Sequence, residues 1–131
     1  MKITALVESS EQIPEWENIL EIAWSPRQFD FILINEMTAE DFTETGLIFM
    51  IAEDQPSCVT HLEFLKQLHI PVVFNFRTVD LHITKELINI NGKALVDHHI
   101  SVGKLREVFK TVADGGLYFS RTKEVEPFLM S

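Results

Sequence analysis

The stretch "LIFMIA" (residues 47–52) decides the fold class, because it is a strand-length run without a polar side chain. A strand with one face in water alternates apolar and polar residues, whereas a strand buried on both faces does not. The other apolar runs of strand length are Ile3–Val7, Phe29–Ile34, Pro71–Phe76 and Ala94–Val96. The sequence therefore predicts a sheet that is covered on both faces.

Segments with helical spacing separate these runs. Ser9 or Ser10 can cap a first helix, in which Ile13, Trp16 and Leu20 fall on one face. Further helical segments are expected after Thr38, Ser57, Thr84 and Ser101. Strands that alternate with helices form a parallel sheet with right-handed crossovers. We therefore expect an α/β fold, namely a doubly wound five-stranded parallel sheet with helices on both faces.

The composition fits one cytoplasmic domain. A chain of 131 residues with 46% hydrophobic content can bury a core without disulfides, and its single cysteine, Cys58, cannot form an internal one. No apolar run approaches the roughly 20 residues that cross a bilayer. Residues 1–54 hold twelve acids and two bases, within a net charge of −9. Such a field repels nucleic acid phosphates, so we expect no direct nucleic acid binding, and without a long apolar run we expect no membrane partner.

The last third of the chain resembles a known family. "IPVVFNF" (residues 70–76), "ALVDHHIS" (94–101) and "VGKLREVFKTVADGGLYFS" (102–120) are similar to the end of the receiver domain of response regulators. In that family the last helix often ends in a similar glycine and tyrosine pattern where a helix-turn-helix output domain follows. The resemblance implies the flavodoxin-like strand order 2-1-3-4-5. It also implies a receiver-like domain over residues 1–120, with 121–131 as a tail or the start of a linker.

The resemblance also implies that the phosphorylation chemistry of the family is lost. Receivers hold Mg²⁺ with two acids after the first strand, phosphorylate an aspartate at the end of the third, and complete the site with Thr or Ser and with Lys. Those positions fall here on Glu8, Ser9, Ala52, Asn75 and His98. Aspartyl phosphorylation needs a carboxylate nucleophile, a divalent ion and a cation. We therefore expect no catalytic residue, no enzymatic activity and no cofactor.

A second alignment of the third strand stays open at this stage. "FDFILINEMTAEDF" (residues 29–42) also resembles the family's third strand and following loop, and it would put Asn35 at the acceptor position. This alignment leaves little room for a second strand between Trp24 and Phe29. It lacks the acceptor carboxylate as well, so both alignments predict an inactive site.

The adjacent histidines His98 and His99 allow several interpretations. Neighbours on a strand point to opposite faces, so the two side chains are not expected to share a role. They can be polar residues at a strand end, and His98 could titrate beside Glu8 or Asp97. His82 and His98, with Glu8, are weak candidates for a metal site, because imidazole and carboxylate suit Zn²⁺. No metal-binding motif supports that site, so none is predicted.

Three classes of function remain. The first is an atypical receiver-like regulatory module that acts without phosphorylation, through dimerisation or ligand binding, and controls transcription. The second is a stand-alone protein-interaction adaptor, and the third is a metal-dependent sensor or enzyme. For the first class we expect a homodimer through the last helix, which would face the acidic first helix of a second copy. Its predicted interface residues are Lys104, Leu105, Arg106 and Lys110.

Overall fold

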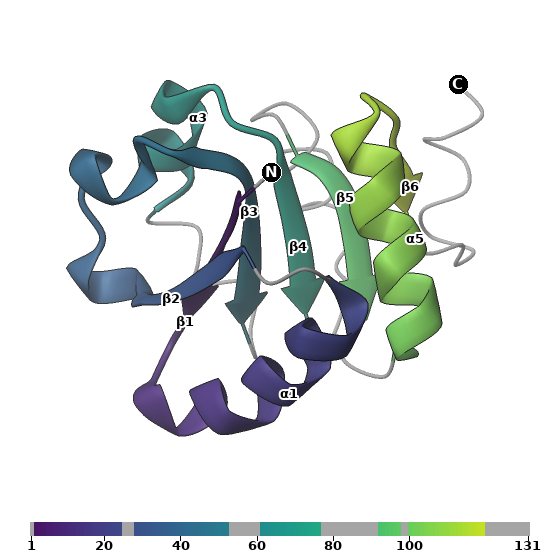
Figure 1. Cartoon of the computed structure of the whole chain (residues 1–131). Coiled ribbons are helices and arrows are strands. Elements are labelled where there is room, and N and C mark those ends of the chain that lie inside the picture. Colours follow the sequence, from purple (N-terminus) through teal and green to yellow (C-terminus); the bar gives the residue numbers. More distant parts are fainter. Residues whose placement is uncertain (1, 25–27, 53–60, 77–91, 98–99, 120–131) are drawn as a thin grey trace.

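The computed structural model describes residues 2–24, 28–52, 61–76, 92–97 and 100–119. Its centre is a parallel sheet in the order β2-β1-β3-β4-β5-β6 (Figure 1). The strands are β1 (Lys2–Val7), β2 (Phe29–Leu33), β3 (Thr45–Ala52), β4 (Val72–Phe76), β5 (Gly92–Asp97) and β6 (Tyr118–Phe119). The predicted fold class and the order of the first five strands are confirmed.

Strand β3 shows why its sequence is wholly apolar. Leu47, Phe49 and Ile51 belong to the core on one face of the sheet, whereas Ile48 and Met50 belong to the core on the other face. All five side chains are fully buried. The burial of one such side chain stabilises the fold by about 1.5–3 kcal/mol. The two-sided burial predicted from this stretch is therefore confirmed.

Helices α1 (Ile13–Ala23) and α5 (Val102–Ala113) cover one face of the sheet, and both lie in front of it in Figure 1. A 3-10 turn, η1 (Ser10–Gln12), leads into α1, and Pro14 occupies its first turn. The hydroxyl of Ser101 accepts a hydrogen bond of 3.2 Å from the backbone N–H of Lys104 and caps α5. Two amphipathic helices thus form one layer.

The other face is covered by shorter elements. They are the 3-10 turns η2 (Ile34–Glu36) and η3 (Ala39–Phe42) and the helix α3 (Leu62–Leu68). The short helix expected after Thr38 is only the single turn η3. His69 ends α3 in the left-handed conformation, with a φ of 57°. The start of the helix expected at Ser57, with Cys58, and the helix expected after Thr84 lie outside the described residues.

A sixth strand was not predicted. Tyr118 and Phe119 follow α5 and pair in parallel with Ala94 and Leu95 of β5. Gly115, with a φ of 89°, makes the turn out of the helix that leads the chain back toward the sheet. The outer edge of β5 is therefore paired along part of its length. Within the described ranges, no helix is long and apolar enough to cross a membrane.

Candidate functional site

The carboxyl end of β3 is apolar. Ala52, the last residue of this strand, is fully buried and pairs with Phe76 of β4. The ring of Phe76 stacks on that of Phe74 at a centroid distance of 5.5 Å. A methyl group has no nucleophilic atom, so this position offers nothing that could accept a phosphoryl group.

Asn75, the next predicted site residue, lies on the opposite face of the sheet. It pairs with Ile51 and Val96, and both of these belong to the core beneath α1 and α5. Ala52 belongs to the other core. Asn75 is completely buried. The structure therefore brings the two positions to the same end of the sheet but does not turn their side chains toward each other.

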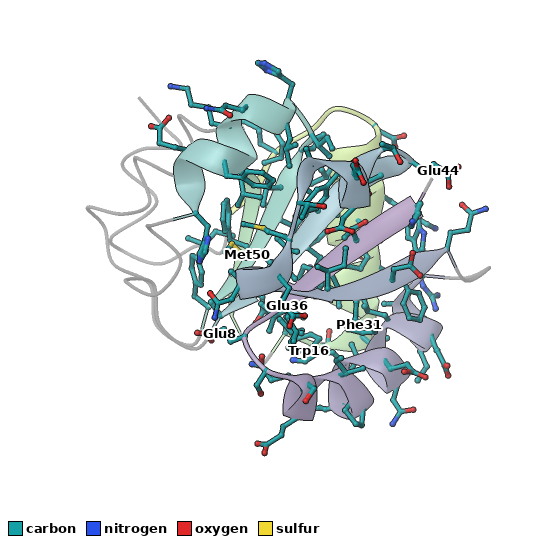
Figure 2. All side chains as sticks on the ribbon, turned by 90° about the vertical axis from the view of Figure 1, so that its left-hand side faces the viewer. Glu8, Trp16, Phe31, Glu36, Glu44 and Met50 are labelled. Atoms are coloured by element: carbon teal, nitrogen blue, oxygen red, sulfur yellow. The ribbon has the colours of Figure 1, made fainter. Side chains whose placement is uncertain are left out.

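The turn after β1 is organised by Gln12. Its side-chain Oε1 accepts hydrogen bonds from the backbone N–H groups of Glu8, at 2.8 Å, and of Ser9, at 3.2 Å. Ser9 has extended backbone angles and is the N-cap of η1. Glu8 is half-buried, and Figure 2 shows it beyond the end of β1. The serine in place of a second acid thus starts the helical layer, which is a structural role.

The topology decides between the two alignments of the third strand. Phe29–Leu33 forms β2 beside β1, and Thr45–Ala52 forms β3 on the other side of β1. Asn35 is an exposed residue of the turn η2. The alternative that made residues 29–34 the third strand, with Asn35 at the acceptor position, is therefore wrong.

The histidine interpretations concern residues that the structure leaves undescribed. His82, His98 and His99 lie outside the described residues. His61 and His69 are at the two ends of α3, where the first is half-buried and the second exposed. Among the described residues, no three His, Cys, Asp or Glu side chains are grouped closely enough to hold a metal ion.

Helix α5 carries three exposed cations, and two of them, Arg106 and Lys110, lie beside α1. Lys104 Nζ lies 3.4 Å from Glu107 Oε2, and Arg106 Nη2 donates a hydrogen bond of 2.6 Å to the backbone oxygen of Ile22. Arg106 and Lys110 line a cavity of about 360 Å³ together with Ala23 and Trp24. The contacts of Arg106 and Lys110 place these two basic residues next to the end of α1.

The prediction that Leu105 belongs to the interface is wrong. It is fully buried in the core beneath α1 and α5, so its side chain cannot lie on a surface between two copies. Lys104, Arg106 and Lys110 are exposed, as an interface requires. Along a helix, residue 105 falls on the same stripe as Phe109 and Val112, which is the face that packs on the sheet.

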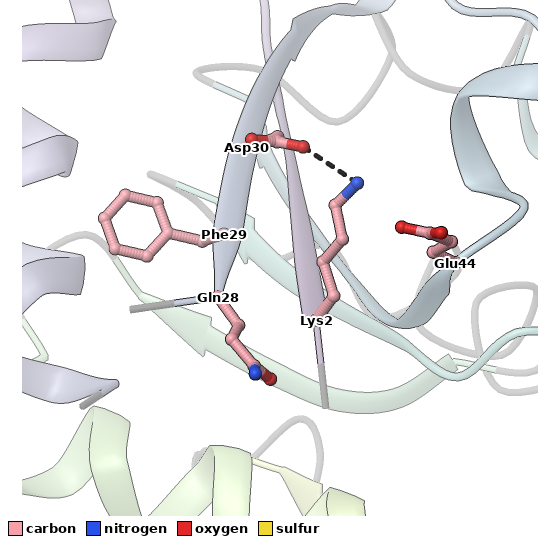
Figure 3. Close-up of a pocket in the computed structure, with 5 residues that line it drawn as sticks. All are labelled: Lys2, Gln28, Phe29, Asp30 and Glu44. Carbon is pink, nitrogen blue, oxygen red and sulfur yellow. Dashed lines mark ion pairs between the residues drawn. The ribbon is translucent and has the colours of Figure 1, made fainter. Parts of the chain in front are cut away.

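A second cavity, which was not predicted, lies at the amino end of β1 and β2. It has a volume of about 480 Å³ and is lined by Lys2, Gln28, Phe29, Asp30 and Glu44 (Figure 3). Lys2 Nζ lies 2.8 Å from Asp30 Oδ2. The hydrogen bond to Asp30, with the further attraction of Glu44, raises the pKa of Lys2. In the sequence, Asp30 is visible as an acid within the apolar run of β2. Its ion pair with Lys2 could not be predicted, because it depends on the pairing of β1 with β2.

Solved structures of response regulators resemble this fold. A LuxR family DNA-binding response regulator from Silicibacter pomeroyi has a TM-score of 0.71 at 15% identity, over 92% of this chain and 98% of that chain. A LuxR family two-component response regulator from an Aurantimonas species has a TM-score of 0.72 at 7% identity, over 99% and 98%. A CpaE pilus assembly protein from Caulobacter crescentus has a TM-score of 0.60 at 15% identity, over 85% and 98%.

No protein-family model and no curated protein matches the chain. The structural likeness, together with the strand order, defines the class: the chain has the fold of response regulator receiver domains. A fold alone does not fix a function, so the function depends on the residues of this chain.

Proposed function

We propose that this chain is a receiver-like regulatory module that acts without aspartyl phosphorylation. The observation that carries the proposal is Ala52, which ends β3 with a buried methyl group where receivers place the phosphoaccepting aspartate. Ser9 caps a turn where a second Mg²⁺ ligand would stand. A phosphoryl group added here would have neither a nucleophile nor a complete metal site to stabilise it.

The output of the module is dimerisation through α1 and α5. On α1, Glu15 and Glu17 are exposed, and on α5 Lys104 and Lys110 are exposed. A two-fold axis beside these helices brings the acidic helix of one copy to the basic helix of the other and uses each contact twice. Strand β6 pairs with part of the outer edge of β5, next to α5, and so leaves less of that edge open to a second copy. This favours the helical surface as the interface.

Transcription is the process that this module controls, from the cytoplasm, through a DNA-binding output in the same protein or in a partner. The support is the structural likeness to two LuxR family response regulators, one of which, from Silicibacter pomeroyi, is described as DNA-binding. The net charge of −9 argues against direct DNA contact by these residues. The likeness to pilus assembly proteins with the same fold supports the alternative of a protein-interaction adaptor.

Treatment with a small phosphodonor tests the proposal. The protein is incubated with acetyl phosphate and Mg²⁺, its intact mass is measured, and its sedimentation is recorded with and without the donor. We expect no mass increase and an association state that the donor leaves unchanged. A receiver domain with a complete aspartate site, treated in parallel, should gain one phosphoryl group. A stoichiometric adduct on this chain contradicts the proposal.

A further inference from the structure

The two edges of the sheet differ in what pairs with them. The outer edge of β5 is paired with β6 at residues 94 and 95. Strand β2, at the other edge, pairs only with β1 in the part of the chain that the structure describes. An unpaired strand presents its backbone donors and acceptors to other chains. The edge of β2 is thus a potential binding surface.

The register shows which backbone groups of β2 point away from the sheet. Ile3 pairs with Phe29, and the N–H of Ile3 donates to the oxygen of Gln28 at 2.7 Å. In a parallel ladder, alternate residues direct both backbone groups to the same neighbour. The backbone groups of Gln28, Asp30 and Ile32 are therefore directed toward β1. The N–H and C=O groups of Phe29 and Phe31 and the N–H of Leu33 point outward, whereas the C=O of Leu33, the N-cap of η2, belongs to that turn.

The side chains of the same three residues are apolar. Phe29, Phe31 and Leu33 are half-buried and pack against the core on the α1 and α5 face. The rings of the two phenylalanines meet edge to face at 5.9 Å, and Figure 2 shows Phe31 directed from β2 toward α1. On the other face, Ile32 packs against the second core. A strand added at this edge would cover apolar surface on both sides.

The surroundings of this edge are acidic. The segment 28–52, which holds β2, both 3-10 turns and β3, contains no Lys, Arg or His. Its five acids are Asp30, Glu36, Glu40, Asp41 and Glu44. Figure 2 shows Glu44 near the start of β2 and Glu36 beyond its end. Lys2, the neighbouring base, is paired with Asp30 (Figure 3).

The charge selects between two possible occupants. In a second copy paired through its own β2, Glu36 and Glu44 of both chains would meet at one interface, which like-charge repulsion opposes. A cationic segment would be attracted by the same residues. We propose that the edge of β2 binds an extended basic segment of another protein, with alternating apolar and cationic residues, as an additional strand. This binding is independent of dimerisation through α1 and α5.

The probe for this proposal is a fluorescent peptide of about eight residues, a common strand length, in which lysine and valine alternate. Its binding to the full chain is measured by fluorescence anisotropy, and the contacted backbone is identified from amide chemical shifts. Two comparison peptides carry glutamate in place of lysine, or proline at alternate positions. We expect the basic peptide alone to bind, with shifts confined to β2 and its neighbours and an affinity that falls as salt is raised.

Leu33 allows the backbone contact to be tested without damage to the sheet. Its φ of −71° suits proline, and its N–H points outward, so Leu33→Pro removes a donor that β1 does not use. Leu33→Ala is the matched control, because it shortens the side chain and keeps the N–H. Leu33→Pro should weaken peptide binding about tenfold relative to Leu33→Ala, since a peptide carbonyl loses its donor.

The charge is tested with Glu36→Gln and Glu44→Gln, both at exposed positions. The double variant should bind the basic peptide more weakly and with a smaller dependence on salt. Equal binding of basic and acidic peptides contradicts the proposal, and so do amide shifts that lie outside β2 and its neighbours. So does absence of binding by a folded wild-type chain. A wild-type dimer that Leu33→Pro dissociates and Leu33→Ala does not would show that a second copy occupies the edge, and would also overturn it.

Discussion

Arg106 of α5 donates a hydrogen bond of 2.6 Å from Nη2 to the backbone oxygen of Ile22 in the last turn of α1. The carbonyl groups in the last turn of a helix lack partners within the helix, and the helix dipole makes this end partially negative. One guanidinium therefore satisfies an acceptor, neutralises partial charge and holds the two helices of this layer together.

The first prediction concerns this contact. Arg106→Gln should lower the free energy of unfolding by about 1 kcal/mol, because a charged hydrogen bond at a helix end is lost. Lys104→Gln is the control. Lys104 is a cation of the same helix, and its described contact is an exposed ion pair with Glu107. Its loss should lower the free energy of unfolding by less than about 0.5 kcal/mol. Urea unfolding measures both, and equal losses would show that the contact to Ile22 contributes nothing specific.

The second prediction concerns the burial of Leu105. Leu105→Ala should destabilise the protein by about 2 to 5 kcal/mol, because it leaves a cavity in the core. Leu117→Ala makes the same chemical change at a side chain that is 57% exposed, and it should cost less than about 1 kcal/mol. Thermal unfolding of the pair checks the assignment. Similar melting temperatures would mean that residue 105 is not a core position.

The core could be predicted from the sequence because the spacing of apolar residues depends directly on which side chains are buried. The run 47–52 could be interpreted because a strand serves two cores only if both of its faces are apolar. Strand β6 was missed because two residues after a glycine pair carry no measurable period. The helix after Thr38 was overestimated, since a threonine cap predicts where a helix begins and not how far it continues.

The candidate site was predictable only in part, for a different reason. Ala52 was assigned through the resemblance to receivers, which puts the acceptor at the end of the third strand, and this assignment needs no tertiary information. The bond from Arg106 to Ile22 and the pair of Lys2 with Asp30 join residues far apart in the sequence, so they depend on which elements become neighbours. Leu105 was assigned to the interface although its helical spacing already put it on the buried stripe. That error could have been avoided from the sequence, because the spacing predicts burial.

The third prediction follows from the raised pKa of Lys2. A group whose pKa is higher in the folded state stabilises the fold fully below its unfolded pKa, about 10.4 for lysine. That contribution is lost as the pH rises through the folded pKa. Asp30→Asn should therefore lower stability at neutral pH, by less than about 1 kcal/mol for so exposed a pair, and the difference should disappear above the folded pKa. Urea midpoints of both proteins across alkaline pH test this, and a constant difference contradicts it.

The fourth prediction concerns restoration of the acceptor. Ala52→Asp should remain unphosphorylated by acetyl phosphate and Mg²⁺, because the resemblance to receivers puts Ser9 and His98 at the positions of the second metal-binding acid and the lysine, and neither supplies that group. It should also lower stability by roughly 2 to 4 kcal/mol, since a polar group enters a fully buried position. Ala52→Asn has nearly the same size and no carboxylate, and serves as the control in intact-mass measurements. An adduct on the aspartate variant alone would show that the rest of the site is functional.

The last prediction tests the dimer by exchanging charges. Lys104→Glu combined with Lys110→Glu should convert the dimer to a monomer, because each symmetric contact is then a repulsion between acidic helices. Lys66→Glu, on an exposed position of α3, also makes the chain more acidic and should leave the dimer intact. Exposed ion pairs contribute at most about 1 kcal/mol each, and salt screens them. The wild-type dimer should therefore weaken as the salt concentration is raised.

The complementary variant makes this test specific. Glu15→Lys combined with Glu17→Lys should also be monomeric by itself, since both helices are then basic. A mixture of the acidic and the basic variant should associate again, because the acidic α5 of one chain meets the basic α1 of the other. Sedimentation velocity of the two variants and of their mixture measures this directly. A mixture that stays monomeric, or an acidic variant that still dimerises, would place the interface on another surface.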